Sequence, residues 1–195
     1  MSFDRGEARR RAMLVFWKHG YEATSLNDLT SALGVPPSSI YTAFGDKKGL
    51  FLEAVECYLS GPITSQSIID DAADGKEAAW SLLQAAAVGF TGEDTPAGCL
   101  LASAAISCSD QAHDVQAALA AIRGGIEEQL RKKIANSVAA DVLPHGPDAE
   151  ALAAHTMAVI QGLSTLARDG AGRAKLLRVA EIAMLVWSKT PLKKA

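Results

Sequence analysis

The chain has 195 residues, of which 49% are hydrophobic and 21% are charged. This composition is typical of a folded globular protein and excludes a disordered or collagen-like chain. No apolar run approaches the ~20 residues of a membrane helix, and the first residues are charged, unlike a secretory signal. The three cysteines are an odd number without the spacing of a zinc site. We therefore expect a cytoplasmic protein with no membrane partner, no disulfide framework and no metal.

Charge is distributed unevenly along the chain. The first 52 residues contain seven Lys or Arg and five Asp or Glu, a balance of +2, whereas the whole chain has a net charge of −3 and the remainder is therefore −5. If the protein binds a polyanion, the N-terminal end is the expected place. An excess this small also arises by chance, so charge alone leaves both interpretations open.

The sequence predicts an all-α protein. Apolar residues recur at three- and four-residue steps, and no run alternates as a strand would. Ser25 and Asp28 can form a capping box, Gly34 can end the helix that follows, and Pro37 suits a first helical position. The pair Gly124-Gly125 is expected to interrupt the longest helix. The predicted helices span residues 4–19, 25–34, 37–43 and 47–59, then 63–72, 76–90, 99–108, 112–139, 148–168 and 173–189.

Residues 25–44 have the spacing of a helix-turn-helix, a motif whose second helix enters the DNA major groove. Leu29 and Leu33 of the first helix can pack against Val35 and Ile40. The outward positions of the second helix carry short polar groups, so base readout would depend on short contacts. Any three-helix core can contain this unit, so the motif alone leaves a purely structural role open.

A longer stretch carries a family resemblance. Its segments are Gly20-Tyr21-Glu22-Ala23-Thr24-Ser25, Leu33-Gly34-Val35, Ser39-Ile40-Tyr41 and Phe44-Gly45-Asp46-Lys47-Lys48-Gly49-Leu50-Phe51. Over residues 5–55 the chain resembles the DNA-binding domain of the TetR family of bacterial transcription repressors. Residues 98–101 and 161–170 are similar to ligand-domain segments of one TetR subgroup.

The resemblance implies two domains and a regulatory function. Residues 1–52 would form a three-helix DNA-binding domain, and residues 53–195 a larger helical domain for effector binding and dimerisation. The implied protein is a ligand-responsive repressor that binds a partly palindromic operator in double-stranded DNA as a homodimer and is released by a small-molecule effector. The alternative is a helical adaptor that binds only proteins, which would leave the pattern over residues 20–51 unexplained.

The resemblance also assigns residues to DNA. Tyr41 and Lys47 match family positions that contact phosphates, and Lys48 is a further candidate. Thr24 and Ser25 lie where a helix N-terminus can hold a phosphate, although a hydroxyl that caps the helix is not free for this contact. The implied DNA contacts are Thr24, Ser25, Pro37, Ser38, Ser39, Tyr41, Thr42, Lys47 and Lys48, of which Pro37, Ser38 and Thr42 fall where family members touch base edges.

The last two helices carry small or apolar stripes, which the resemblance assigns to the dimer and which a monomeric core would equally use. The expected interface is Ala151, Ala154, Ala158, Gly162, Thr165, Leu177, Ala180, Met184 and Trp187. Apolar residues and one lone polar group on the inner helices are candidates for the effector pocket, with ordinary core packing as the alternative. These candidates are Trp80, Phe90, Leu101, Ile106, Met157, Ile160 and Gln161.

No motif of an enzyme or cofactor site occurs in the chain: there is no Gly-rich phosphate loop, nucleophile elbow or His-Glu-x-x-His sequence. We therefore expect no catalytic residues and no cofactor. Cys99 and Cys108, placed on one continuous helix, would lie roughly 13 Å apart on opposite sides. A disulfide requires Cα atoms within ~7 Å. We predict that both cysteines are inert packing residues and not a redox or metal switch.

Overall fold

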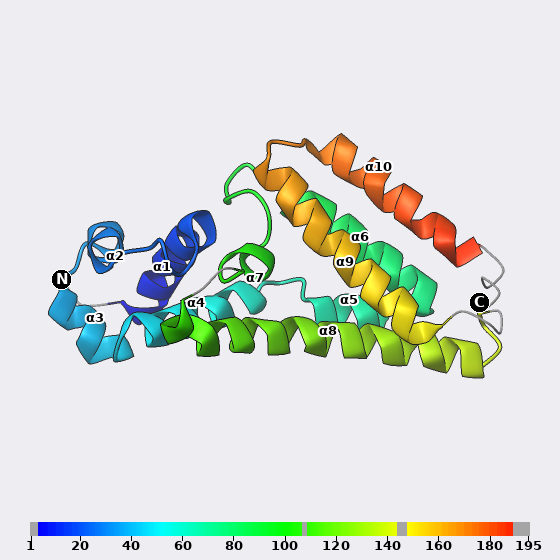
Figure 1. The fold of residues 1–195 in the computed structure, drawn as a ribbon, viewed down its shortest axis with the longest axis horizontal. Helices are drawn as coiled ribbons and strands as arrows, with labels where there is room; N and C mark the ends of the chain where they lie inside the picture. Colours follow the sequence, from blue (N-terminus) through cyan, green and yellow to red (C-terminus); the bar gives the residue numbers. More distant parts are fainter. Residues whose placement is uncertain (1–3, 107–108, 144–147, 189–195) are drawn as a thin grey trace.

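The computed structural model describes residues 4–106, 109–143 and 148–188, and within these ranges it contains ten α-helices, two short 3-10 helices and no strand. The all-α prediction is confirmed. The molecule is elongated, with a small N-terminal unit (α1 to α4) at one end and a larger helical body (α5 to η2) at the other (Figure 1). Among the helices of the described ranges, none is both long and apolar enough to cross a membrane.

Local capping chemistry sets the ends of the helices in the N-terminal unit. The Asp4 carboxylate caps the first helix, Ser25 and Asp28 form the expected capping box, and Asp46 caps the fourth helix. Pro36 precedes the third helix and provides no side-chain cap, as the sequence indicates. The four helices are α1 (Arg5–His19), α2 (Leu26–Leu33), α3 (Pro37–Phe44) and α4 (Lys47–Leu59).

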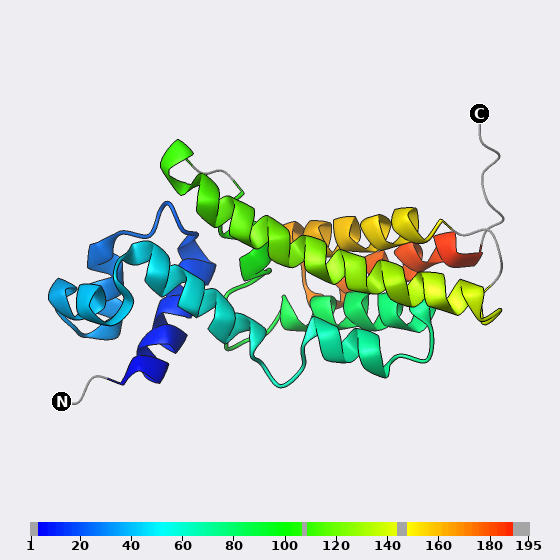
Figure 2. The same cartoon turned by 90° about the horizontal axis from the view of Figure 1, so that it is seen from below.

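The body is built from six α-helices, of which α8 runs along the long axis and α6 and α9 cross it at an angle, with α10 outermost (Figures 1 and 2). The pair Gly124-Gly125 does not interrupt α8, contrary to expectation. The elements are α5 (Ser65–Asp71), α6 (Gly75–Gly89), α7 (Leu100–Ser103), η1 (Asp110–Ala112), α8 (His113–Ala139), α9 (Ala149–Arg168), α10 (Arg173–Ala183) and η2 (Met184–Ser188).

The prediction of a helix over residues 99–108 is wrong. Over residues 99–106, the part that the structure describes, only the single turn α7 forms, and the chain then leaves helical geometry. The Ala104 carbonyl accepts a hydrogen bond from the backbone N–H of Tyr21, at 2.7 Å, instead of from a following helical turn. The separation expected for the two cysteines assumed a continuous helix and does not apply, and Cys108 lies outside the described residues.

Two hydrophobic cores stabilise the molecule. The first extends from the N-terminal unit into the near half of the body and includes Phe16, Phe51 and Leu100, each fully buried. The second occupies the far half of the body, around Leu130 and Ile134. The N-terminal unit therefore shares its core with the body. The domain boundary expected after residue 52 falls inside α4, which belongs to this shared core.

Candidate nucleic-acid interface

Helix α3 presents an exposed polar face at the end of the molecule. Ile40 and Phe44 are buried, one turn apart, and anchor α3 on its neighbours. The opposite side of α3 is therefore turned to solvent, and Tyr41 is 53% exposed. The Thr42 hydroxyl donates to the Ser38 carbonyl at 2.8 Å, which fixes the orientation of this side chain. Of the α3 residues assigned to DNA, only Ser39 is half-buried, and the exposed ones are Pro37, Ser38, Tyr41 and Thr42.

Thr24 and Ser25, the two hydroxyl residues assigned to a phosphate at the N-terminus of α2, differ in exposure. Thr24 is fully buried, and its hydroxyl donates to the Gly20 carbonyl at 2.6 Å, so its side chain is not available to DNA. Ser25 is exposed and accepts from the N–H of Asp28 at 3.1 Å. The Ser25 hydroxyl and N–H also donate to the Asp28 carboxylate and hold its pKa below the usual value. Ser25 therefore caps α2, and the Thr24 hydroxyl is engaged inside the turn between α1 and α2.

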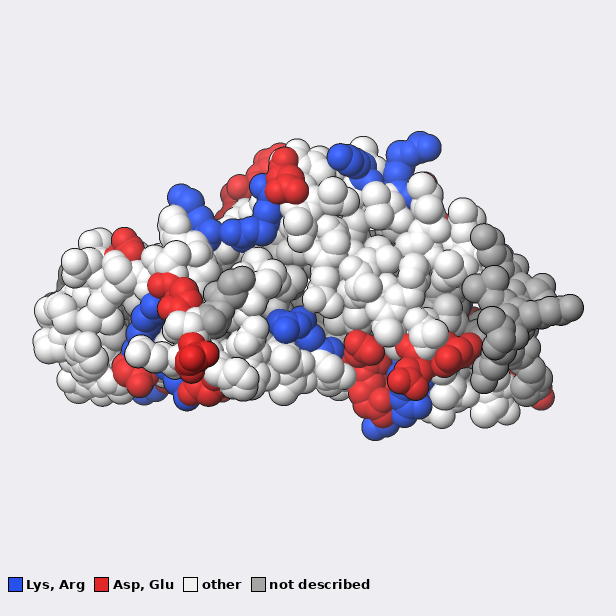
Figure 3. Space-filling view, viewed as in Figure 1, with Lys and Arg blue, Asp and Glu red and all other residues white. Residues whose placement is uncertain are grey.

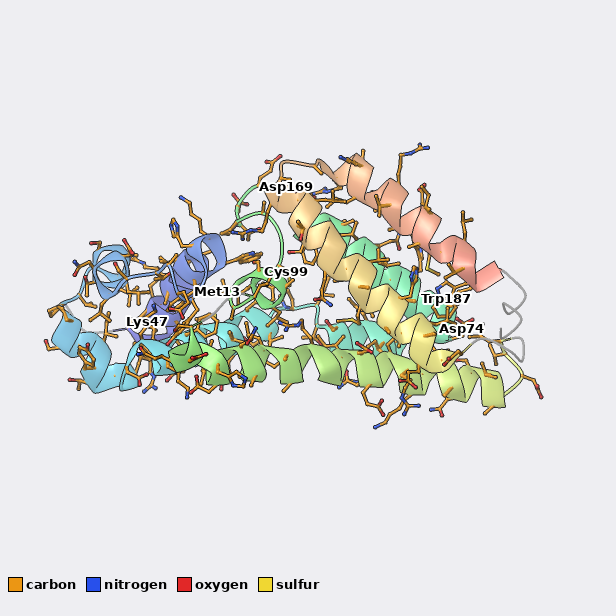
Figure 4. The ribbon with its side chains drawn as sticks, viewed as in Figure 1. Met13, Lys47, Asp74, Cys99, Asp169 and Trp187 are labelled. Atoms are coloured by element: carbon orange, nitrogen blue, oxygen red, sulfur yellow. The ribbon has the colours of Figure 1, made fainter. Side chains whose placement is uncertain are left out.

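Lys47 opens α4 next to the turn between α1 and α2. Its ammonium group donates to the Glu22 carbonyl at 3.4 Å and lies 4.5 Å from the centre of the Tyr21 ring. Figure 4 shows Lys47 in the N-terminal unit, far from Trp187 at the other end of the molecule. Lys48 forms an ion pair with Asp114 in the first turn of α8. The two lysines therefore differ: Lys47 is oriented within the N-terminal unit, and Lys48 connects that unit to the body.

Most arginines of α1 are paired inside the N-terminal unit. Arg5 forms an ion pair with Glu53 of α4, which ties the two helices together. Arg10 and Arg11 both donate to Glu7, and these bonds lower the pKa of Glu7 to about 2. In the view of Figure 3, acidic and basic groups alternate where the N-terminal unit meets the body, and its far end carries few charges.

The residues assigned to an effector pocket do not converge on one cavity. Leu101 and Met157 are buried, whereas Ile106 is 64% exposed and Gln161 lies on the outer side of α9, which removes both from an interior pocket. Phe90 lines a hollow of about 420 Å³ next to the turn between α9 and α10. The two remaining candidates, Trp80 and Ile160, are half-buried.

A larger cleft, of about 700 Å³, lies between α1 and the connection from α6 to α7, where Leu14 and Lys18 face Glu93 and Pro96. Sequence reasoning missed it because its walls come from distant segments. Within the described ranges, no group of three His, Cys, Asp or Glu side chains is placed to hold a metal ion.

The α9 stripe and the α10 stripe assigned to the dimer differ in exposure. The α9 stripe lies on the outside of the body, whereas Leu177 and Ala180 of α10 and Met184 and Trp187 of η2 pack against the chain's own cores. Ala180 in particular is fully buried and cannot reach a partner. The outward side of α10 and η2 instead carries Ile182, Leu185 and Val186, and the exposed α9 residues are Ala151, Ala154, Ala158, Gly162 and Thr165.

Family models match both parts of the chain. Residues 10–54 match the model for bacterial regulatory proteins of the tetR family, and residues 75–181 match the tetracyclin repressor-like C-terminal domain. The chain belongs to the TetR family. It is therefore a DNA-binding regulator of transcription and not an enzyme, and the family predicted from the sequence is confirmed.

Two curated TetR-family relatives from Escherichia coli (strain K12) align over most of their length. The chain is 32% identical over 187 residues to the HTH-type transcriptional repressor ComR, covering 95% of this chain and 89% of ComR. It is 28% identical over 178 residues to the HTH-type transcriptional repressor BdcR, covering 91% of this chain and 85% of BdcR.

A solved TetR-family structure is similar over the whole fold. The regulator CifR, in a structure of a cysteine mutant complexed with 26-bp double-strand operator DNA and apo-CifR, superposes with a TM-score of 0.90 at 38% identity. The match covers 96% of this chain and 98% of CifR. A second CifR cysteine mutant, in complex with 26-bp double-strand operator DNA, superposes with a TM-score of 0.91 at 37% identity, so the described conformation is close to that of a relative bound to its operator.

Proposed function

We propose that this protein is a homodimeric repressor that binds a partly palindromic operator and is released by a small-molecule effector. The observation that carries the DNA-binding part is the exposed polar face of α3, with Lys47 and Ser25 at the N-termini of the neighbouring helices. Helix N-termini and lysines suit phosphates, and short polar side chains suit base edges. The repressor sense is supported by ComR and BdcR, which are both named repressors.

The dimer is supported by an unpartnered apolar face on the body. Small residues on α9 allow another helix to approach closely, and Ile182 of α10 and Leu185 of η2 are 65% and 58% exposed. A monomeric protein rarely leaves such a surface in water. Two-fold symmetric DNA recognition also requires two copies of α3. The proposed interface therefore keeps the α9 stripe and replaces the four inward residues of α10 and η2 with the outward residues Ile182, Leu185 and Val186.

The effector part is supported by the division of the body into two cores. Ile126 and Ile160 pack against both cores, whereas Met157 is buried and belongs to neither. An apolar ligand that binds between the two cores, next to these residues, would displace the first core, which continues into the N-terminal unit. Coupling between an effector and DNA is typically ~1–3 kcal/mol, so such a ligand must bind two states of the protein differently.

Selection from a random double-stranded DNA pool with the full-length protein tests this function. The expected result is an enriched sequence with two inverted half-sites, and two chains bound per duplex by light scattering. Recovery of no enriched sequence would contradict the proposal, as would binding of one chain to a single half-site. The recovered duplex then serves as the probe for effector screening, in which release is read as loss of DNA binding.

A further inference from the structure

The turn between α1 and α2 is held by the connection between α7 and α8. The backbone N–H of Tyr21 donates to the Ala104 carbonyl at 2.7 Å. The N–H and hydroxyl of Ser109 donate to the Glu22 carboxylate at 2.8 and 2.6 Å. A Cβ at Gly20 would lie 3.3 Å from the Ala104 carbonyl oxygen, so the two segments touch through their backbones. Figure 2 shows the start of α8 extending beside the N-terminal unit.

The same turn also holds Lys47. The Glu22 carbonyl accepts from the Lys47 ammonium group, and the Tyr21 ring lies beneath it. Glu22 thus has two contacts: its carboxylate accepts from Ser109 of the body, and its carbonyl accepts from Lys47. Because a lysine side chain is flexible, a fixed partner reduces the conformational freedom that Lys47 loses on binding a phosphate.

We propose that Glu22 is a positioning residue for DNA binding, which carries the placement of the α7–α8 connection to Lys47. This role rests on the proposed function, since it requires Lys47 to contact operator phosphate. When Ser109 withdraws, the turn loses its support and Lys47 loses its orientation. The ion pair between Lys48 and Asp114 and the bond from the Gln116 amide to the Ile106 carbonyl, at 3.1 Å, hold the same connection in place.

The direction in which Glu22→Ala changes DNA affinity distinguishes a positioning role from simple charge repulsion. The bonds from Ser109 lower the pKa of the Glu22 carboxyl, so this group is charged at neutral pH. An anion close to a phosphate-binding lysine opposes DNA binding, and its removal alone should strengthen the complex. A positioning role predicts the opposite, because Glu22→Ala frees the turn that orients Lys47.

The experiment measures equilibrium binding of the full-length protein to the selected operator duplex across a salt series. Wild type is compared with Glu22→Ala, Ser109→Ala, Lys47→Ala and the Glu22→Ala/Lys47→Ala double variant. The charge control is Glu56→Ala, which removes an exposed carboxylate from α4. Ser109→Thr, which retains the hydroxyl, is the conservative variant. Thermal melts compare the folding of each protein.

We expect Glu22→Ala to bind about three- to tenfold more weakly than wild type, in the lower part of the range for coupled neighbouring groups. Its slope of log affinity against log salt should fall by about 0.9, one phosphate contact. The double variant should bind no more weakly than Lys47→Ala. Ser109→Ala should lose less operator affinity than Glu22→Ala, and Ser109→Thr should bind as tightly as wild type. If Glu22→Ala does not fold, the affinity of Ser109→Ala tests the positioning role.

Three results would overturn the role of Glu22. In the first, Glu22→Ala binds the operator as tightly as Glu56→Ala or more tightly. In the second, the double variant loses more affinity than Lys47→Ala alone. In the third, Ser109→Ala binds as tightly as wild type. If the wild-type protein selects no sequence at all, the proposed function fails and the role of Glu22 fails with it. If wild type selects an operator and Lys47→Ala weakens it, a failure at Glu22 concerns the positioning role alone.

Discussion

Gly98 is the position where a single methyl group should most damage the junction between the N-terminal unit and the body. Its φ is +83°, and its carbonyl accepts a hydrogen bond from the Trp17 indole at 3.1 Å. A Cβ there would lie 2.8 Å from Cγ of Arg168 and 2.9 Å from the Ser164 carbonyl oxygen. The Ser164 hydroxyl is engaged by the N–H of Cys99 at 2.8 Å, so this wall cannot move freely.

The expected cost of Gly98→Ala has two parts. A positive φ costs a residue with a Cβ about 1–2 kcal/mol, and overpacking of a filled site costs about 1–3 kcal/mol. Together these lower the free energy of unfolding by about 2–5 kcal/mol, a large share of the total for a typical domain. Arg168, which donates to the Trp17 and Lys18 carbonyls at 3.1 and 3.2 Å, would shift with the new methyl group.

The assay is urea unfolding followed by circular dichroism, at one protein concentration because a dimer's stability depends on concentration. The matched control is Gly124→Ala in α8, where a Cβ would meet no atom within 4 Å. Alanine there should stabilise the protein by about 0.5–1 kcal/mol. A Gly98→Ala protein within about 0.5 kcal/mol of wild type would refute the reasoning.

Substitutions at three further positions test other parts of the account. Ala158→Glu, on the exposed α9 stripe, should give monomers in light scattering, whereas Ala120→Glu, at an exposed position of α8, should remain dimeric. If both variants remain dimeric, the proposed interface is contradicted. Ser25→Ala should lower the free energy of unfolding by about 1 kcal/mol through the lost cap, whereas Ser25→Asp should keep stability and weaken DNA binding by repelling a phosphate. The Arg131 guanidinium lowers the pKa of Glu128 from 4.5 to about 2, so Glu128 stabilises the fold above pH 4.5 and loses this effect as the pH falls toward 2. The urea midpoints of wild type and Glu128→Gln should therefore differ above pH 4.5 and converge toward pH 2. A difference that stays constant with pH would count against this pairing.

The elements that local chemistry determines could be predicted from the sequence. Gly34, Asp46 and the Ser25 capping box act within a few residues of the helix ends that they set, and α2, α3 and α4 form where the sequence indicates. The outward residues of α3 were predicted for the same reason, since burial of Ile40 and Phe44 determines which side faces solvent.

What depends on distant contacts could not be predicted. The alanine-rich run after Cys99 resembles a helix, yet Tyr21 takes the Ala104 carbonyl that a longer helix would use. The inward stripe of α10 and η2 resembles an interface in the sequence because periodicity shows that a face is apolar and not what covers it. The pairing of Lys48 with Asp114 joins residues 66 positions apart, beyond the reach of any local pattern.

Specific recognition of an operator by a dimer is the central claim, and one measurement tests it most directly. The full-length protein is titrated against the selected duplex and a scrambled duplex of equal length and composition, at one physiological salt concentration. The account predicts that the selected duplex binds at least about 1,000-fold more tightly, the lower range for specific protein–DNA recognition, with two chains per duplex. Equal affinity for both duplexes would contradict it.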